Sequence, residues 1–300
     1  MVSGPSTDGC PTADPIVTLE LAVVVPCHNV EHTLAEQLES LVTQRWEQPW
    51  GIIVVDNNST DNTLEVAMAY VDRGVRVVQA SAGRGVAYAR NTGIRASNAR
   101  AVALCDGDDV VHSGWVEAMG NAVSEHDLVS GSLETTSLNP DYLARSRPMG
   151  VSDRLNTFGS TPFASGGNCA MRVEIFEHLG GFDEHFDGLE DIEFSLRANK
   201  LGIEVVLERE AKLAYRMRPE PGDTWRQGQF YGAGRPLLIQ RALELGLDAP
   251  SRWQGIRSWT WLLLKLPRAR TRAGRYQLLW VLAFRLGVLK RAVQLRRPYI

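Results

Sequence analysis

The chain of 300 residues has only four cysteines, Cys10, Cys27, Cys105 and Cys169, and no two of them form a CxxC pair. This scatter supports neither a zinc site nor a disulfide framework, and it favours a reducing compartment. The first residues have no basic start and no apolar core, so we expect no secretory signal and a cytoplasmic protein. We interpret residues 1–18 as a disordered leader.

Acidic residues are missing from the C-terminal end. No Asp or Glu follows Asp248, whereas the last 52 residues carry twelve Lys or Arg. The net charge of −3 therefore combines an acidic body with a basic segment, which favours a polyanionic partner. Nucleic acid is a poor candidate because the body is acidic and no recognition motif is present.

Residues 249–300 also lack an apolar run of the roughly 20 residues that a membrane-spanning helix needs. Apolar residues nevertheless recur at helical spacing, and four tryptophans accompany them: Leu278, Leu282, Leu286, Leu289, Val293, Trp253, Trp259, Trp261 and Trp280. The pattern favours a basic amphipathic helical tail on an anionic membrane, at residues 251–300, so that the protein is peripheral on the inner face. A helical hairpin packed on the core, with its arginines solvated, is the alternative.

The rest of the chain alternates between two patterns. Short apolar runs at 21–26, 51–56, 75–80 and 100–105 predict buried strands, and the segments between them have helical periodicity. This alternation of strand and helix patterns predicts βαβ units, and therefore an α/β fold with a mainly parallel central sheet and helices on both faces. We place this domain at residues 19–248 and read 134–165 as a long connection.

Polar residues follow the strands, at the sheet edge where ligands bind in such folds. Asp106-Gly107-Asp108-Asp109 comes directly after a buried strand. Carboxylates this close repel one another, and a divalent cation with phosphate ligands would offset the repulsion. A solvated acidic turn that caps the next helix is the alternative.

Three further segments have both functional and structural interpretations. Residues 56–61 can bind a nucleoside or form an ordinary turn. Gly83-Arg84-Gly85 can cradle a phosphate, and Arg90 can reach a diphosphate or lie on the surface. Glu190-Asp191 can deprotonate a hydroxyl or cap a helix.

Six segments, taken in order, resemble the family-2 inverting glycosyltransferases of the GT-A fold, which is Rossmann-like. They are VVVPCHN (23–29), VVDNNSTDNT (54–63), GRGVAYARNTGI (83–94), LCDGDDV (104–110), SGGNCAMR (165–172) and GGFDEHFDGLEDIEFSLRANKLG (180–202). The resemblance covers roughly residues 20–240 and implies transfer of a sugar from a nucleotide-diphosphate donor, with UDP favoured, to a hydroxyl of a glycan or lipid-linked acceptor.

The resemblance also implies roles for individual residues. Asp191 is expected to be the general base, and Glu190 to contact the acceptor or the donor sugar. Asp106 and Asp108 are the expected ligands of Mg²⁺ or Mn²⁺, with Asp109 as a further candidate. The donor is expected at Pro26, His28, Asn29, Asp56, Asn57, Arg84, Arg90, Asp106, Gly107 and Asp108, and the sugar and acceptor pocket at Gly166, Gly167 and Asn168.

One departure from the family pattern stands out. Tyr215 occupies the position where many members have a metal-binding His. We hypothesise that nearby arginines, Arg216, Arg218, Arg226 and Arg235, take over part of the metal's role at the diphosphate. A non-catalytic nucleotide-sugar-binding scaffold is the main alternative function. A nucleotidyltransferase is disfavoured because PCHNVEHT offers no Gly-rich, Lys-containing loop.

Overall fold

The central sheet confirms the predicted α/β architecture. The computed structural model describes residues 18–147, 154–186 and 188–296, so all but the last residue of the expected leader lies outside the described part. In spatial order the eight strands are β3 (Val75–Gln79), β2 (Trp50–Asp56), β1 (Leu19–Cys27), β4 (Ala99–Cys105), β9 (Asn168–Arg172), β6 (Leu128–Glu134), β10 (Val205–Ala214) and β5 (Val110–Val111). β9 and β5 run antiparallel to their neighbours and the other pairings are parallel.

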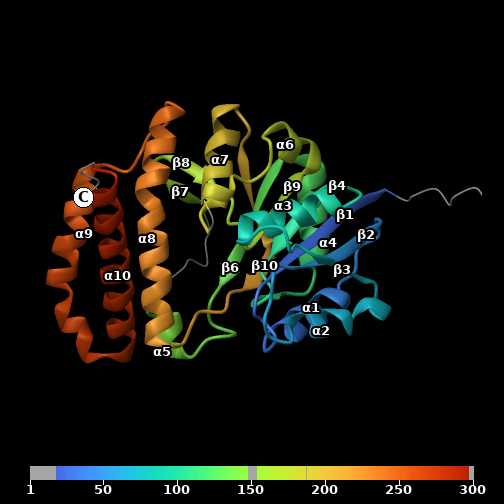
Figure 1. Cartoon of the computed structure of the whole chain (residues 1–300), viewed down its shortest axis with the longest axis horizontal. Coiled ribbons are helices and arrows are strands. Elements are labelled where there is room, and N and C mark those ends of the chain that lie inside the picture. The colour runs from blue at the N-terminus through green and yellow to red at the C-terminus, as the bar shows by residue number, and fades with distance from the viewer. Residues whose placement is uncertain (1–17, 148–153, 187, 297–300) are drawn as a thin grey trace, which may run out of the picture.

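Helices cover both faces of this sheet (Figure 1). Alternate side chains of β1 point to opposite faces, as strand geometry requires, so Val23 and Val24 lie in two different hydrophobic clusters. One face packs on α1 (Leu34–Val42), α2 (Thr63–Met68) and α4 (Trp115–Glu125). The other packs on α3 (Val86–Ala96), α6 (Val173–His178) and α7 (Glu190–Lys200). A continuous apolar run such as LAVVVP is typical of a strand buried on both faces.

The segment that we expected to be a long connection contains regular structure. It holds α5 (Asp141–Ala144) and a hairpin of β7 (Asn156–Phe158) and β8 (Thr161–Phe163). Phe158 is buried against α7 and α8 (Pro221–Glu244), so this hairpin forms part of a third hydrophobic cluster. The prediction of one long connection over 134–165 therefore missed the elements at Asp141–Ala144, Asn156–Phe158 and Thr161–Phe163. The described residues also include the 3-10 turns η1 (Val71–Arg73), η2 (Glu184–Phe186) and η3 (Leu266–Arg270).

The predicted helical C-terminal region consists of α9 (Arg252–Leu264) and α10 (Arg272–Gln294). α10 lies between α9 and α8, and it packs along α8 over much of its length (Figure 1). Glycines allow this close approach: a Cβ at Gly228 would come within 2.9 Å of the Ala283 Cβ, and one at Gly232 would collide with the Phe284 carbonyl. None of the described helices has the length and the apolarity needed to cross a membrane.

Gly232→Leu should separate α8 from α10, because the new side chain would meet the backbone of Phe284. Overpacking of this kind costs about 1–3 kcal/mol of unfolding free energy. We expect a lower thermal unfolding midpoint. Gly222→Ala is the matched control in the same helix, since a Cβ there meets only Arg226 at 3.7 Å. An equal midpoint for both variants would contradict this account of the packing.

Candidate functional site

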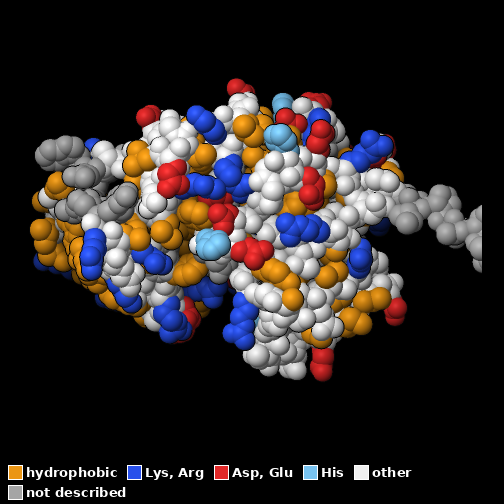
Figure 2. All heavy atoms as spheres, turned by 45° about the horizontal axis from the view of Figure 1, so that its top comes forward, with side chains coloured by type: hydrophobic (Ala, Val, Ile, Leu, Met, Phe, Trp, Pro, Cys, Tyr) orange, Lys and Arg blue, Asp and Glu red, His pale blue; other side chains and the backbone are white. Residues whose placement is uncertain are grey.

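A cavity of about 1440 Å³ lies at the carboxyl ends of the central strands. Its walls come from the turns after β1, β2 and β4, the first residues of α3 and α7, the β7–β8 hairpin, α8 and α10. Figure 2 shows acidic, basic and hydrophobic side chains meeting near the middle of one face of the molecule. The site thus unites segments spread over most of the sequence, as expected for the strand ends of a parallel sheet.

Arg90 joins two carboxylates at the centre of the site. Its side chain is only 4% exposed; Nη2 lies 2.7 Å from Asp106 Oδ1, and Nη1 donates a hydrogen bond to Glu190. Burial lowers the pKa of Arg90, but Asp106 and Glu190 outweigh it and the net pKa is raised. The alternative of a surface arginine is wrong. Arg90 holds the end of β4 and the start of α7 at a fixed separation.

Asp191 lies beside this bridge on the first turn of α7. Its Oδ2 accepts a hydrogen bond from the Gly166 amide at 2.8 Å, and Oδ1 accepts one from the Ile192 amide at 2.7 Å. Burial raises the pKa of Asp191, although the hydrogen bonds from these amides and the charge of Arg90 lower it. A Cβ at Gly166 would collide with Arg90, so the close approach of this backbone requires glycine. A half-buried carboxyl with a raised pKa is suited to accept a proton.

Asp106 and Asp108 both line the cavity. Burial and the neighbouring Asp106 raise the pKa of Asp108, which reflects the electrostatic cost of two adjacent carboxylates. No group of three or more acidic, His or Cys side chains in the described part of the chain could hold a metal alone. Two carboxylates completed by substrate phosphates suit Mg²⁺, so these residues fit a divalent cation. Asp109 is 1% exposed and accepts a hydrogen bond from the Arg216 amide at 2.7 Å.

Of the two residues expected at the end of β2, Asn57 lines the cavity and Asp56 does not. Asp56 is 6% exposed, and its Oδ1 has no hydrogen-bond partner among the described residues. Asn57, by contrast, uses its side chain within the protein: Nδ2 donates to the Gly83 carbonyl at 2.9 Å and Oδ1 accepts from the Gly85 amide at 2.9 Å. Its carbonyl also lies 2.8 Å from His28 Nδ1. Asn57 thus shapes the loop before α3.

Most of the other expected residues line the cavity, namely Pro26, His28, Asn29, Arg84, Gly107, Gly166, Gly167 and Glu190. Asn168 does not. Its side chain is fully buried, donates to the carbonyls of Ser132 and Ala211, and accepts from Trp115 Nε1 at 2.8 Å. The expectation that Asn168 helps to form the wall of the sugar and acceptor pocket is therefore wrong for its side chain, because every polar atom of the amide already has a partner in the core.

The arginines proposed to act together do not form one cluster. Arg218, Arg226 and Arg235 line the cavity, but Arg216 does not. The Arg216 Nε donates to the Asp108 carbonyl at 2.8 Å, and its Nη2 lies 2.5 Å from Glu36 Oε2. Arg216 therefore supports the Asp106–Asp109 turn from outside. Tyr215 lines the cavity with its pKa raised to about 12, chiefly by burial.

Several cavity residues were not foreseen from the sequence. Phe230 and Tyr231 of α8 and Trp280 and Phe284 of α10 all line the cavity. Trp280 was expected at a membrane interface, and that expectation is wrong. Aromatic residues four positions apart on one helix, as at 280 and 284, were the available signal.

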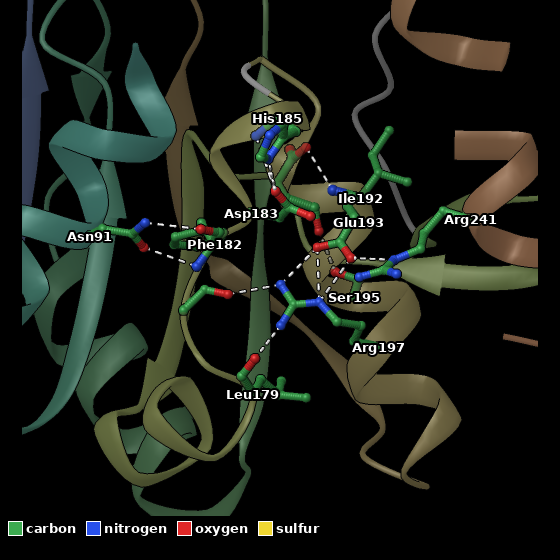
Figure 3. Close-up of polar contacts among 12 residues, drawn as sticks. Asn91, Leu179, Phe182, Asp183, His185, Ile192, Glu193, Ser195, Arg197 and Arg241 are labelled. Atoms are coloured by element: carbon green, nitrogen blue, oxygen red, sulfur yellow. Dashed lines mark hydrogen bonds and ion pairs between the residues drawn. The ribbon is translucent and has the colours of Figure 1, made fainter. Parts of the chain in front are cut away.

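A network of hydrogen bonds holds α7 in place (Figure 3). Glu193 is fully buried and binds Arg197 Nη2 at 2.7 Å and Arg241 Nε of α8 at 2.8 Å. Arg197 also donates to the Gly181 carbonyl at 2.8 Å, and Asn91 of α3 pairs with the backbone of Phe182 through both amide atoms at 2.9 Å. Because α7 begins with Glu190 and Asp191, this network positions the candidate base.

The family model described as glycosyl transferase family 2 matches residues 22–180, more than half of the chain. The chain belongs to glycosyl transferase family 2. It is 25% identical over 205 residues to glycosyltransferase AglE of Haloferax volcanii, covering 66% of this chain and 67% of AglE. It is also 29% identical over 90 residues to an Escherichia coli enzyme named UDP-Glc:alpha-D-GlcNAc-diphosphoundecaprenol beta-1,3-glucosyltransferase WfgD, covering 30% of this chain and 35% of WfgD.

Solved structures agree on the fold of this family 2 chain. The mannosyltransferase PcManGT of Pyrobaculum calidifontis, in complex with GDP-Man and Mn²⁺, superposes with a TM-score of 0.59 at 18% identity. The match covers 93% of this chain and 89% of PcManGT. The fold is of the GT-A type, as predicted. The chain matches about a third of the length of several curated relatives, WfgD among them.

Glu193→Ala should destabilise the protein, because it leaves Arg197 and Arg241 without their buried partner. Removing one member of a buried ion pair costs about 3 kcal/mol or more. Urea denaturation should show this loss. Glu210→Ala is the matched control, since Glu210 is 76% exposed in its pair with Lys212 and such surface pairs contribute little. Equal stability of the two variants would contradict the role of the network.

Proposed function

We propose that this chain is an inverting glycosyltransferase that uses a nucleotide-diphosphate sugar as donor. The observation that carries the proposal is the meeting of two kinds of carboxylate in one cavity. Asp191 is half-buried at the cavity with a raised pKa, as suits a base, and Asp106 and Asp108 have the arrangement of cation ligands. Arg90 spans the two sides of the site. A scaffold that only bound the donor would have no need for a carboxyl with a raised pKa at Asp191.

The reaction is a single displacement. Asp191 accepts the proton of the acceptor hydroxyl, whose oxygen attacks the anomeric carbon as the bond to the diphosphate breaks. Attack opposite the leaving group inverts the anomeric configuration. Glu190, held by Arg90, orients the sugar. A divalent cation held by Asp106 and Asp108, with Asp109 behind them, would neutralise the charge of the departing diphosphate.

We propose UDP-sugar as the donor and residues 19–248 as the transferase domain. Asp56 supports a nucleoside contact at the end of β2, because its Oδ1 has no partner among the described residues. The name of WfgD gives UDP-Glc as donor and a diphosphoundecaprenol-linked sugar as acceptor, whereas PcManGT was solved with GDP-Man. By analogy with WfgD, the acceptor is a lipid-linked glycan.

Asp191→Asn should keep donor binding and lose transfer by on the order of a hundredfold or more, because the amide cannot accept the proton. Binding is measured as the thermal shift with UDP, GDP and dTDP, each with and without Mn²⁺. As the pH is lowered, wild-type activity should be lost at a higher pH than an Asp of ordinary pKa would cause. Burial raises the pKa of Asp191, and only its deprotonated form acts as a base. Glu177→Gln, at an exposed position in α6, is the control.

Full turnover by Asp191→Asn would remove Asp191 as the base. Absence of a thermal shift with every nucleotide in the wild-type protein would instead count against the transferase proposal as a whole.

We further propose that α9 and η3 rest on an anionic membrane on its cytoplasmic side. Leu263, Leu264 and Leu266 are 69%, 77% and 58% exposed, and the exposed Arg268 and Arg270 follow directly. Apolar side chains flanked by arginines match a lipid surface with acidic headgroups. This charge complementarity selects a membrane over an apolar protein partner.

Replacing Leu263 and Leu264 together by Asp should abolish flotation with vesicles of anionic phospholipid, because both apolar contacts are lost and two like charges are added. Met68→Asp is the control, since Met68 is 53% exposed on α2, far from α9 (Figure 1). Circular dichroism shows whether each variant is folded. Undiminished flotation of the folded double variant would exclude this surface as the anchor.

A further inference from the structure

Arg147, which follows α5, is a buried cation that lines the cavity. Its exposed fraction is 9%. Nη1 donates to Gln227 Oε1 at 3.0 Å, whereas the buried Nη2 has no hydrogen-bond partner in the part of the chain that the structure describes. The guanidinium carbon lies 5.5 Å from the centre of the Trp280 ring. Among the described residues, no carboxylate forms an ion pair with it.

Arg235 is half-buried and also lines the cavity. Its guanidinium lies between two rings, 5.4 Å from the centre of Phe158 and 5.8 Å from that of Phe284. It too has no ion-pair partner among the described residues. The pKa of Arg235 is lowered to about 10 by burial and by Arg285, and burial likewise lowers the pKa of Arg147. An uncompensated buried charge is costly, so the position of Arg147 favours a ligand of opposite sign, and the half-buried Arg235 adds to that preference.

Arg147 lies at a different wall of the cavity from the residues expected to hold the donor diphosphate. That group belongs at Asp106 and Asp108, at the end of β4. Arg147 instead contacts Gln227 of α8 and the ring of Trp280 of α10. An anion at Arg147 would therefore lie against the wall that α8 and α10 form.

The same wall is rich in aromatic side chains. Phe158, Phe230, Trp280 and Phe284 line it beside the two arginines. An anionic group held there would have apolar surface next to it. A phosphate suits a guanidinium fork, and an attached hydrocarbon or a sugar face suits the rings.

We propose that the α8–α10 wall binds an acceptor that carries a phosphate or diphosphate, with Arg147 as its main cation and Arg235 as a second. The proposal rests on the transferase function and names the chemistry of its acceptor. Two sources share this chemistry: a lipid-linked sugar diphosphate and a soluble phosphorylated sugar or polyol.

The test uses the full chain saturated with UDP and Mn²⁺, so that the nucleotide site is already filled. Geranyl diphosphate, inorganic pyrophosphate and geraniol are the probes, and calorimetry measures their affinities. We expect geranyl diphosphate to bind the wild type. Arg147→Gln should lower this affinity about tenfold or more, as for a lost hydrogen bond to a charged group. Arg145→Gln is the matched control, because Arg145 is 75% exposed two residues away.

The probes also identify the source of the anion. Tighter binding of geranyl diphosphate than of pyrophosphate supports a lipid-linked acceptor, and equal binding supports a soluble phosphorylated one. Equal affinity of wild type and Arg147→Gln for geranyl diphosphate overturns the proposal, as does tight binding of geraniol.

The variants must separate this site from the donor site. Arg147→Gln should bind UDP as the wild type does, which also shows that it is folded. A variant that loses UDP together with geranyl diphosphate would assign Arg147 to the donor and overturn the proposal. If Arg147→Gln fails to fold, Arg235→Gln is measured against the same probes with the same expectation. A wild type that binds no nucleotide refutes the transferase function instead, and geranyl diphosphate alone then still tests the anion site.

Discussion

The site depends on one buried cation. Without Arg90, the carboxylates of Asp106, Glu190 and Asp191 would repel one another with no positive charge between them. Arg90 bonds to both Asp106 and Glu190, so one cation offsets part of this repulsion and fixes the positions of both carboxylates. We proposed proton transfer for Asp191 and cation binding for Asp108 together with Asp106, and neither Asp191 nor Asp108 forms an ion pair with Arg90. A guanidinium suits this place because it stays charged even when buried and presents several donors in one plane.

The position of α7 is the second constraint, and it is set outside the cavity. Glu193 and Arg197 anchor the first turns of the helix to the loop before it, and Arg241 extends the anchor to α8. The same α8 carries Tyr231 and Arg235 to the cavity and receives α10 along its length. The C-terminal helices therefore support the wall beside Asp191.

Features of the fold could be predicted from the sequence where a residue pattern directly indicates which side chains are buried. The run LAVVVP predicted a strand covered on both faces, and the sheet order placed Asp106 and Asp108 at its ligand-binding edge. The contacts of the asparagine side chains were less predictable. Asn57 and Asn168 are as suited to backbone groups as to a sugar, and only tertiary structure decides which they contact. The 156–163 hairpin was missed because three-residue strands leave too short a pattern.

The basic C-terminal composition also conceals two different uses of arginine. Arg268 and Arg270 are exposed beside Leu266, whereas Arg285 of α10 is 6% exposed and packs over Trp259. The sequence does not distinguish exposed from buried arginines. Basic composition together with apolar spacing therefore predicted a single membrane-facing tail. In the structure α10 lines the cavity with Trp280 and Phe284, while α9 presents leucines outward. One segment thus combines a lipid-compatible exterior with an aromatic, cationic interior, as an acceptor with a hydrocarbon anchor and a phosphate would require.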